Sequence, residues 1–229
     1  MWLRSLNFSP MDFDIENLGK TVQIVEGGPD QEISQEDLDA LTWGLMRSYY
    51  PQYDLDPESA THPMGVWKTF KRDRGFIEEF IKSPDCVLAK DGDRIIGLSM
   101  IKKMDVSASD GRPYVLYSIS SVLTEYRGYG LYEEMYKRKD EKCREKFPDA
   151  IVVAMSKTPA VIKTALKHGF IEISHFEWKE RMGKPRDDEH VARLEKQGWV
   201  CFLRDDREKK DVGEIIVNTE DAVNTISPQ

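Results

Sequence analysis

The stretch from residue 114 to residue 155 constrains the fold more than any other part of the sequence. Tyr114 to Leu123 (YVLYSISSVL) is rich in β-branched and aromatic residues and predicts a long strand. Arg127 to Tyr132 (RGYGLY) is a glycine-rich turn, Leu131 to Lys146 predicts a helix, and Ala150 to Met155 (AIVVAM) is typical of a buried strand. A strand, a helix and a second strand in this order favour parallel pairing of the two strands.

The remaining segments continue an alternation of strands and helices. Short apolar or β-branched runs predict strands at 21–25, 86–90, 94–102, 170–178, 199–203 and 213–217. Apolar residues at helical spacing predict helices at 34–50, 67–80, 158–166 and about 191–194. Asp91-Gly92 between two strand-like runs predicts a hairpin with a type I′ turn. This order indicates an α/β or α+β domain with a mixed sheet, and the passage from 150 to 178 predicts a second parallel pairing.

The length of the chain sets its domain organisation. At about 150 residues per domain, 229 residues make one large domain or two small ones, with enough surface burial for a real core. We expect one domain over residues 20–204, which carries a charged insertion at 179–197. Residues 1–19 then form an N-terminal extension, and residues 205–229 form a polar tail.

Charge and cysteine content narrow the class of protein. The 41 acidic and 33 basic residues give a net charge of −8, which argues against a nucleic-acid partner held by bulk electrostatics. That charge fits a small cationic partner, although a solvated acidic surface is the commoner reason for it. Residues 1–17 lack a secretory signal, and no apolar run reaches the roughly 18 residues of a membrane span. Cys86, Cys143 and Cys201 lie far apart, which favours free thiols in the cytoplasm and no metal site.

The turn at 127–132 carries the chemistry. The first amides of a helix have no partner inside the helix, and the helix dipole adds positive charge to them. Glycine lets the backbone approach a ligand closely, so the turn predicts a site for phosphate oxygens. Arg127 would add a charged contact or order the turn. The alternative is a turn that serves only close packing, and the spacing fits neither a Walker loop nor a dinucleotide fingerprint.

Two stretches resemble the GNAT superfamily of N-acetyltransferases. Val122 ends a strand, and Arg127 and Gly130 then match the family pattern Arg/Gln-x-x-Gly-x-Gly/Ala, while Gly128 matches its common form Arg-Gly-x-Gly. Residues 158–170 (TPAVIKTALKHGF) resemble a second landmark, a capped helix that ends in Gly-Phe. The order of elements from about residue 20 to 204 also resembles that of the family. The resemblance implies a mixed, mostly antiparallel central sheet with flanking helices, in which a β-bulge splays the strand at 114–123 from the strand at 150–155.

The resemblance also implies an activity and a coenzyme site. Acetyl-coenzyme A would lie between the splayed strands as co-substrate, and an amine would attack its thioester directly. The acceptor would be a primary amine of a small molecule or of a protein. The residues implied to bind the coenzyme are Ser121, Val122, Leu123, Arg127, Gly128, Tyr129, Gly130, Leu131 and Tyr132.

Three positions depart from the family pattern. Tyr132 replaces the last Gly/Ala of the motif, Ala165 stands where many members have a tyrosine as general acid, and Leu116 stands where some have a carboxylate base. Tyr117 and Ser120 are the substitute catalytic candidates, since they are polar groups in a strand expected to be central. The alternative for both is a hydroxyl that bonds only backbone or water.

The acceptor side and the competing functions stay open. Tyr50, Tyr53 and Asp54 combine aromatic rings and a carboxylate that suit a cationic amine, or they form an ordinary polar loop. The insertion and the tail would cap the acceptor site or mediate contacts in a homodimer. The competing hypotheses are a GNAT-fold protein that binds coenzyme A, or nothing, without catalysis, and an unrelated α/β protein whose glycine turn is structural.

Overall fold

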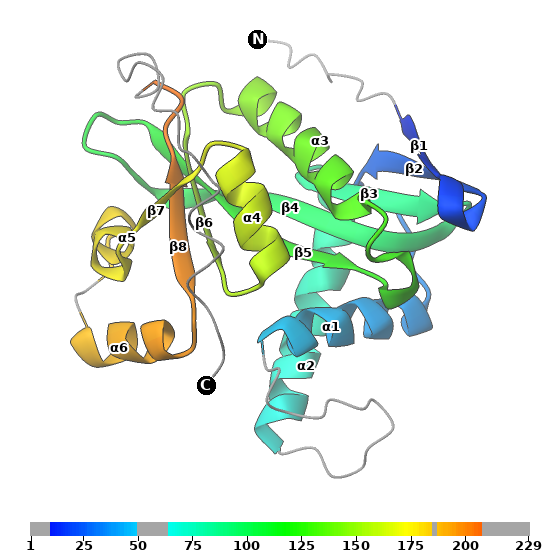
Figure 1. Cartoon of the computed structure of the whole chain (residues 1–229), viewed down its shortest axis with the longest axis horizontal. Helices are drawn as coiled ribbons and strands as arrows, with labels where there is room; N and C mark the ends of the chain where they lie inside the picture. The colour runs from blue at the N-terminus through cyan, green and yellow to red at the C-terminus, as the bar shows by residue number, and fades with distance from the viewer. Residues whose placement is uncertain (1–9, 50–63, 185–186, 208–229) are drawn as a thin grey trace.

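One mixed sheet organises the part of the chain that the computed structural model describes, residues 10–49, 64–184 and 187–207 (Figure 1). The sheet has eight strands in the spatial order β1-β2-β3-β4-β5-β6-β8-β7. In that order their bounds are Met11–Ile15, Lys20–Glu26, Cys86–Asp91, Arg94–Ser107, Pro113–Val122, Ile151–Ser156, Val200–Arg204 and Ile171–Ile173. All neighbours pair antiparallel except β5 and β6, which are parallel. The mixed, mostly antiparallel sheet is therefore confirmed.

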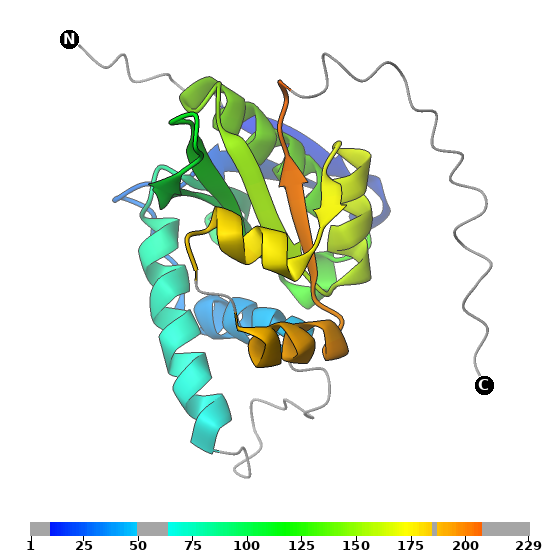
Figure 2. The ribbon, with the colours of Figure 1, turned by 90° about the vertical axis from the view of Figure 1, so that its left-hand side faces the viewer.

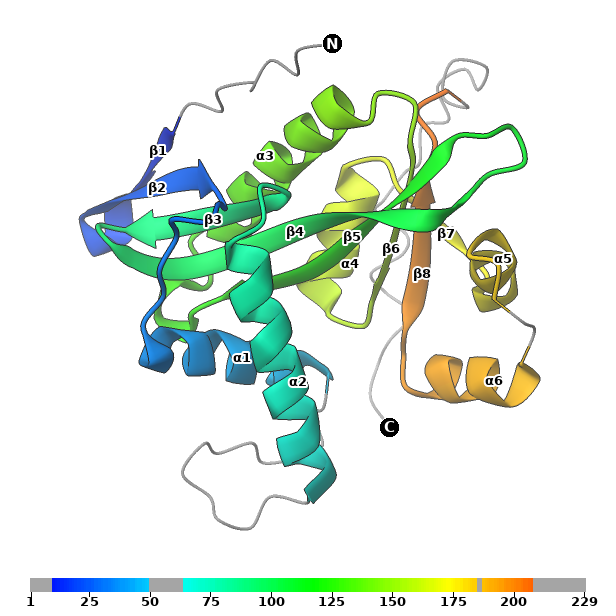
Figure 3. The ribbon, with the colours of Figure 1, turned by 180° about the vertical axis from the view of Figure 1, so that it is seen from behind.

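Helices cover both faces of this sheet. The helices α3 (Leu131–Lys146) and α4 (Pro159–Lys167) lie in front of the sheet in Figure 1, and α2 (Met64–Ile81) lies behind it, as Figure 3 shows. The helix α1 (Gln35–Tyr49) packs against α2 and against β4 and β5. Leu41 and Ile77 are fully buried in the core between these helices and the sheet.

The second expected parallel pairing is wrong. The strand β8 lies between β6 and β7 and pairs antiparallel with both, so β6 and β7 run in the same direction without touching. The place beside β6 goes to the longer strand β8, which buries Cys201, Phe202 and Leu203 completely or almost completely. The strand β7 has only three residues, so it takes the edge.

The strand expected at 170–178 ends at Ile173. The side chain of Ser174 accepts a hydrogen bond from the amide of Glu177 at 3.1 Å and starts the helix α5 (His175–Arg181). The Ser-x-x-Glu spacing is a capping signal, so the start of α5 could be predicted from the sequence. The helix α6 (Asp188–Lys196) follows, and both helices lie beside the end of the sheet formed by β8 and β7 (Figure 2).

Local sequence signals are otherwise close to the structure. Ser34 caps α1, because its Oγ accepts the amide of Asp37 at 3.0 Å. The hairpin at residue 92 is confirmed, but its turn is not type I′, since only Gly92 has a positive φ, +59°. A positive φ confined to the first position of a two-residue loop is typical of type II′. The sequence pattern predicts no strand before residue 20, so the structure adds β1 to the predicted strands. The predicted domain boundaries stay predictions.

Candidate functional site

A β-bulge separates β5 from β6 where the sheet would otherwise continue. The two strands pair only over residues 114–117 and 151–154. The register between β4 and β5 shifts by one residue next to Met100, so that Ser118 and Ile119 lie opposite one residue of β4. A bulge bends the strand that carries it, and β5 leaves β6 at this point. The expected bulge and splay are therefore confirmed.

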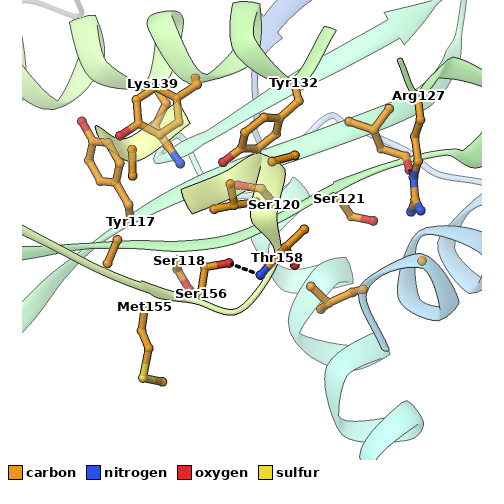
Figure 4. A pocket seen from close by; sticks show the side chains of 18 of the residues that line it. Tyr117, Ser118, Ser120, Ser121, Arg127, Tyr132, Lys139, Met155, Ser156 and Thr158 are labelled. Atoms are coloured by element: carbon orange, nitrogen blue, oxygen red, sulfur yellow. Dashed lines mark hydrogen bonds between the residues drawn. The ribbon is translucent and has the colours of Figure 1, made fainter. Parts of the chain in front are cut away.

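A cavity of about 290 Å³ fills the gap between the two strands (Figure 4). Its walls come from the unpaired ends of β5 and β6, from the turn at 126–130 and from the inner faces of α3 and α4. Gly44 and Leu45 of α1 also line it. The wall is mostly apolar, with hydroxyl groups from the serines of β5 and β6. An apolar pocket with a few convergent polar groups is typical of a small-molecule site.

The glycine turn opens into this cavity. Gly128 and Gly130 have φ values of +84° and +81°, which side-chain-bearing residues adopt only with strain. Both glycines are exposed, and Gly130 is the N-cap of α3. Because glycine has no side chain to cap the helix, the first amides of α3 have no partner from the cap position. The turn therefore has the geometry of an anion site, and no described side chain seals it.

Arg127 orders this turn. Its Nε donates to the carbonyl oxygen of Val122 at 2.8 Å, which ties the turn to the end of β5. Its Nη2 lies so near Gly44 of α1 that a Cβ on that glycine would be 2.6 Å away. Partial desolvation, with the nearby charge of Arg47, lowers the pKa of Arg127. The guanidinium marks one end of the cavity in Figure 4.

Alternate residues of β5 direct their backbone N–H and C=O groups toward β4 or toward the gap beside β6. The amide of Leu123 donates to the carbonyl of Ile96 in β4. Since alternate residues of a strand face opposite neighbours, the backbone of Ser121 also faces β4, and the backbones of Ser120 and Val122 face the gap. Ser121 is predicted to pair with a ligand, but its backbone faces β4. Its hydroxyl also donates a hydrogen bond to the carbonyl of Leu41 at 2.9 Å.

The other predicted coenzyme residues have distinct positions. Leu123 and Leu131 bury their side chains in the core, so only their main chains are available. Tyr129 packs partly against the same core. The side chain of Tyr132 lies along the cavity and points toward Ser120 (Figure 4). Ser120 Oγ bonds Ser99 Oγ at 2.7 Å, and burial raises the pKa of Tyr132.

Tyr117 lines the cavity with its ring but commits its hydroxyl elsewhere. The hydroxyl donates to Asp140 Oδ1 at 2.6 Å, and Asp140 pairs with the buried Arg204 at 2.5 Å. Burial, together with Cys143 and Asp140, raises the pKa of Tyr117 well above its usual value. Because this hydroxyl already donates its hydrogen to Asp140, it has no donor left for a ligand in the cavity.

Lys139 is a site residue that the sequence prediction omits. Its side chain lines the cavity and is 2% exposed, and its Nζ lies 4.4 Å and 4.8 Å from the ring centroids of Tyr117 and Tyr136. Burial lowers the pKa of Lys139 to about 7. A signal was available in helical spacing, because Met135, Tyr136 and Cys143 lie on the same side of α3.

Several predictions concern residues beyond the site. Tyr50, Tyr53 and Asp54, the predicted acceptor residues, lie outside the described residues, as does the strand expected at 213–217. Within the described ranges, no group of His, Cys, Asp and Glu side chains could hold a metal ion. No helix there has the length and apolarity needed to cross a membrane. The three cysteines are free and buried.

Comparison with known proteins finds similarity only among solved structures. No protein-family model and no curated protein matches the chain. The protein PH1933 from Pyrococcus horikoshii is 17% identical, with a TM-score of 0.49, and the match covers 80% of this chain and 98% of that chain. A GNAT-family acetyltransferase from Staphylococcus aureus is 12% identical, with a TM-score of 0.48 and the same coverage. PaiA N-acetyltransferase from Thermoplasma acidophilum, in complex with coenzyme A, is 11% identical, with a TM-score of 0.49 and again the same coverage. Identities and TM-scores this low carry no conclusion about the activity of this chain.

Proposed function

We propose that this chain is an acetyl-coenzyme A-dependent N-acyltransferase of GNAT type. It would transfer an acetyl group to a primary amine of a small molecule or of a protein. One observation carries the proposal: a single cavity joins the open amides of the glycine turn to the unpaired edge of β5. A diphosphate suits the first place, and an extended amide-bearing arm suits the second.

The residues present fit coenzyme A. The amides of Gly128, Gly130 and Leu131 would hold the diphosphate, and the backbones of Ser120 and Val122 would pair with the pantetheine arm. When bound, the coenzyme supplies an acyl group activated as a thioester. An apolar wall excludes water from such a group, and this favours transfer to an amine over hydrolysis.

The chain's own donors would assist the transfer from two positions. A backbone N–H of β5 near the bulge would polarise the carbonyl of the thioester. The hydroxyl of Tyr132, near Ser120, is the donor best placed to protonate a departing thiolate, because the hydroxyl of Tyr117 already donates a hydrogen bond to Asp140. Tyr132 would thus take the role of the tyrosine that many GNAT members have at the position of Ala165. Tyr117 keeps a predicted role only as part of the wall.

A coenzyme-binding protein without catalysis is the second candidate. Ala165 in the wall and the commitment of Tyr117 to Asp140 favour it, since both remove an expected acid. Calorimetry with coenzyme A tests the binding that both candidates share. Release of free thiol from acetyl-coenzyme A in the presence of a panel of amines then separates them, because only the enzyme accelerates that release.

Some predictions stay outside this conclusion. The acceptor contacts of Tyr50, Tyr53 and Asp54, a homodimer, and a role for the insertion at 179–197 remain proposals. The same holds for the cytoplasm as location and for the expectation of no metal, nucleic-acid or membrane partner.

A further inference from the structure

The cavity has a basic side chain at each end, and no acidic side chain among the described residues lines it. Arg127 and Lys139 are the only charged side chains among the described residues that line it. They lie at opposite ends in Figure 4, Arg127 beside the glycine turn and Lys139 beside Tyr117. A molecule held along this cavity with its diphosphate at the turn therefore points its other end at an amine.

No carboxylate among the described residues forms an ion pair with Lys139. It forms no hydrogen bond or ion pair with any described residue, and its contacts are the rings of Tyr117 and Tyr136. The neighbouring carboxylate of Asp140 is instead engaged by Tyr117, Arg204 and Arg144. By contrast, Lys142, almost one turn further along α3, is paired with Glu26.

A buried amine without a carboxylate is uncommon, because burial of an unpaired charge is costly. Packing alone does not explain it, since an apolar side chain of the same length would fill the same space among Tyr136, Ala165 and Phe202. A ligand that supplies an anion would offset the free-energy cost of burying this amine. Lys139 is the basic group that this end of the cavity offers to such a ligand.

We infer, on the basis of the proposed function, that Lys139 binds the terminal carboxylate of a short dicarboxylic acyl group carried by coenzyme A. The preferred donor would then be a thioester such as succinyl-coenzyme A, and acetyl-coenzyme A would fill the cavity only in part. Tyr117 and Tyr136 would flank the methylene groups of the acyl chain. The missing tyrosine at Ala165 would leave room for that chain.

Proton uptake gives this inference a readout that does not depend on activity. Burial lowers the pKa of Lys139 to about 7, so above pH 7 the free protein holds mostly neutral amine. The charged and titratable groups that act on it are Asp140, Cys143, Cys86 and Arg204. A bound carboxylate favours the ammonium form and raises the pKa of Lys139. Binding at pH 8 should therefore take up a proton.

The experiment is calorimetry at pH 8 with three ligands: coenzyme A, butyryl-coenzyme A and succinyl-coenzyme A. The two acyl groups have the same number of carbon atoms and differ in the carboxylate. We expect succinyl-coenzyme A to bind about tenfold tighter than butyryl-coenzyme A, as for a hydrogen bond between charged groups. In buffers of different ionisation enthalpy, only succinyl-coenzyme A should show proton uptake.

Lys139→Met should abolish both the preference and the proton uptake. Lys137→Met, an exposed lysine of the same helix, is the matched control and should keep both. Equal affinity for the two thioesters, a preference that survives in Lys139→Met, or no proton uptake by the wild type would overturn the inference. The wild-type measurements need no variant, so they decide the matter even if Lys139→Met does not fold. Failure of coenzyme A itself to bind would instead refute the proposed function.

Discussion

The hydroxyl of Tyr117 donates a hydrogen bond to Asp140 across 2.6 Å, and Asp140 in turn pairs with Arg204. These three residues come from β5, α3 and β8, so the network links three elements behind the cavity. Arg204 is 1% exposed, and its guanidinium lies 4.9 Å from the ring centroid of Phe170. The network gives Tyr117 a structural task at the place where a catalytic hydroxyl is expected.

Tyr117→Phe should therefore affect stability more than catalysis. Loss of one hydrogen bond should lower the free energy of unfolding by about 1 kcal/mol, because Arg204 still satisfies Asp140. The rate of acyl transfer should stay close to that of the wild type. Urea denaturation and free-thiol release measure the two quantities, and a large loss of rate at unchanged stability would restore Tyr117 as a catalytic candidate.

Tyr132→Phe should have the opposite effect. The variant keeps the ring in the cavity and removes the hydroxyl near Ser120. We expect kcat to fall by roughly a hundredfold or more, the usual contribution of a general acid, while the affinity for coenzyme A changes little. Single-turnover kinetics and calorimetry distinguish the two effects. An unchanged kcat would rule out an acid role for Tyr132.

Gly130→Val should remove coenzyme binding without unfolding the protein. Valine strains the backbone at φ +81° and shifts the first amides of α3. Gly111→Val is the control, since Gly111 has a φ of +83° in the loop between β4 and β5, away from the cavity. Both variants should lose comparable stability, but only Gly130→Val should lose affinity in calorimetry. If both bind coenzyme A equally well, the turn is not the anion site.

Gly44→Ala tests whether Arg127 orders the turn. A methyl group there would lie 2.6 Å from Nη2 of Arg127 and force the guanidinium away. Coenzyme affinity should then fall by about tenfold, the loss of roughly one charge-assisted contact. Gly75→Ala in α2 is the control, because nothing lies within 4 Å of its Cβ position, and it should stabilise the helix slightly. Equal affinity in the two variants would contradict the role given to Arg127.

The buried amine of Lys139 should make stability depend on pH. Burial lowers its pKa in the folded state to about 7, below the value of about 10.4 in an unfolded chain. Between these values the unfolded state binds the proton and the folded state does not, so stability rises with pH, by at most about 1.4 kcal/mol per pH unit. Urea denaturation from pH 7 to pH 9 should show this rise in the wild type and a smaller one in Lys139→Met. Parallel curves would place the pKa of Lys139 near its normal value.

The sequence by itself determined the local elements around the site. The strand before Val122, the glycine turn and the helix after Gly130 follow from patterns between near neighbours, and so do the cap at Ser34 and the hairpin at Gly92. Propensity, capping and turn geometry depend on residues a few positions apart. The cap formed by Ser174 and Glu177 likewise depends only on the spacing of near neighbours.

Only the tertiary structure decided which distant groups meet. The insertion of β8 between β6 and β7 depends on competition between strands for one sheet edge, which no local pattern records. The hydroxyls of Tyr117 and Tyr132 could each face many partners. The packing of α3 on β5 gives the Tyr117 hydroxyl a hydrogen bond to Asp140 and places the Tyr132 hydroxyl near Ser120. A lysine in a helix is expected to be solvated, and Lys139 becomes buried only because α3 packs against the sheet. Its burial arises from side chains far away along the chain, such as Tyr117, and this is why the sequence prediction omits it.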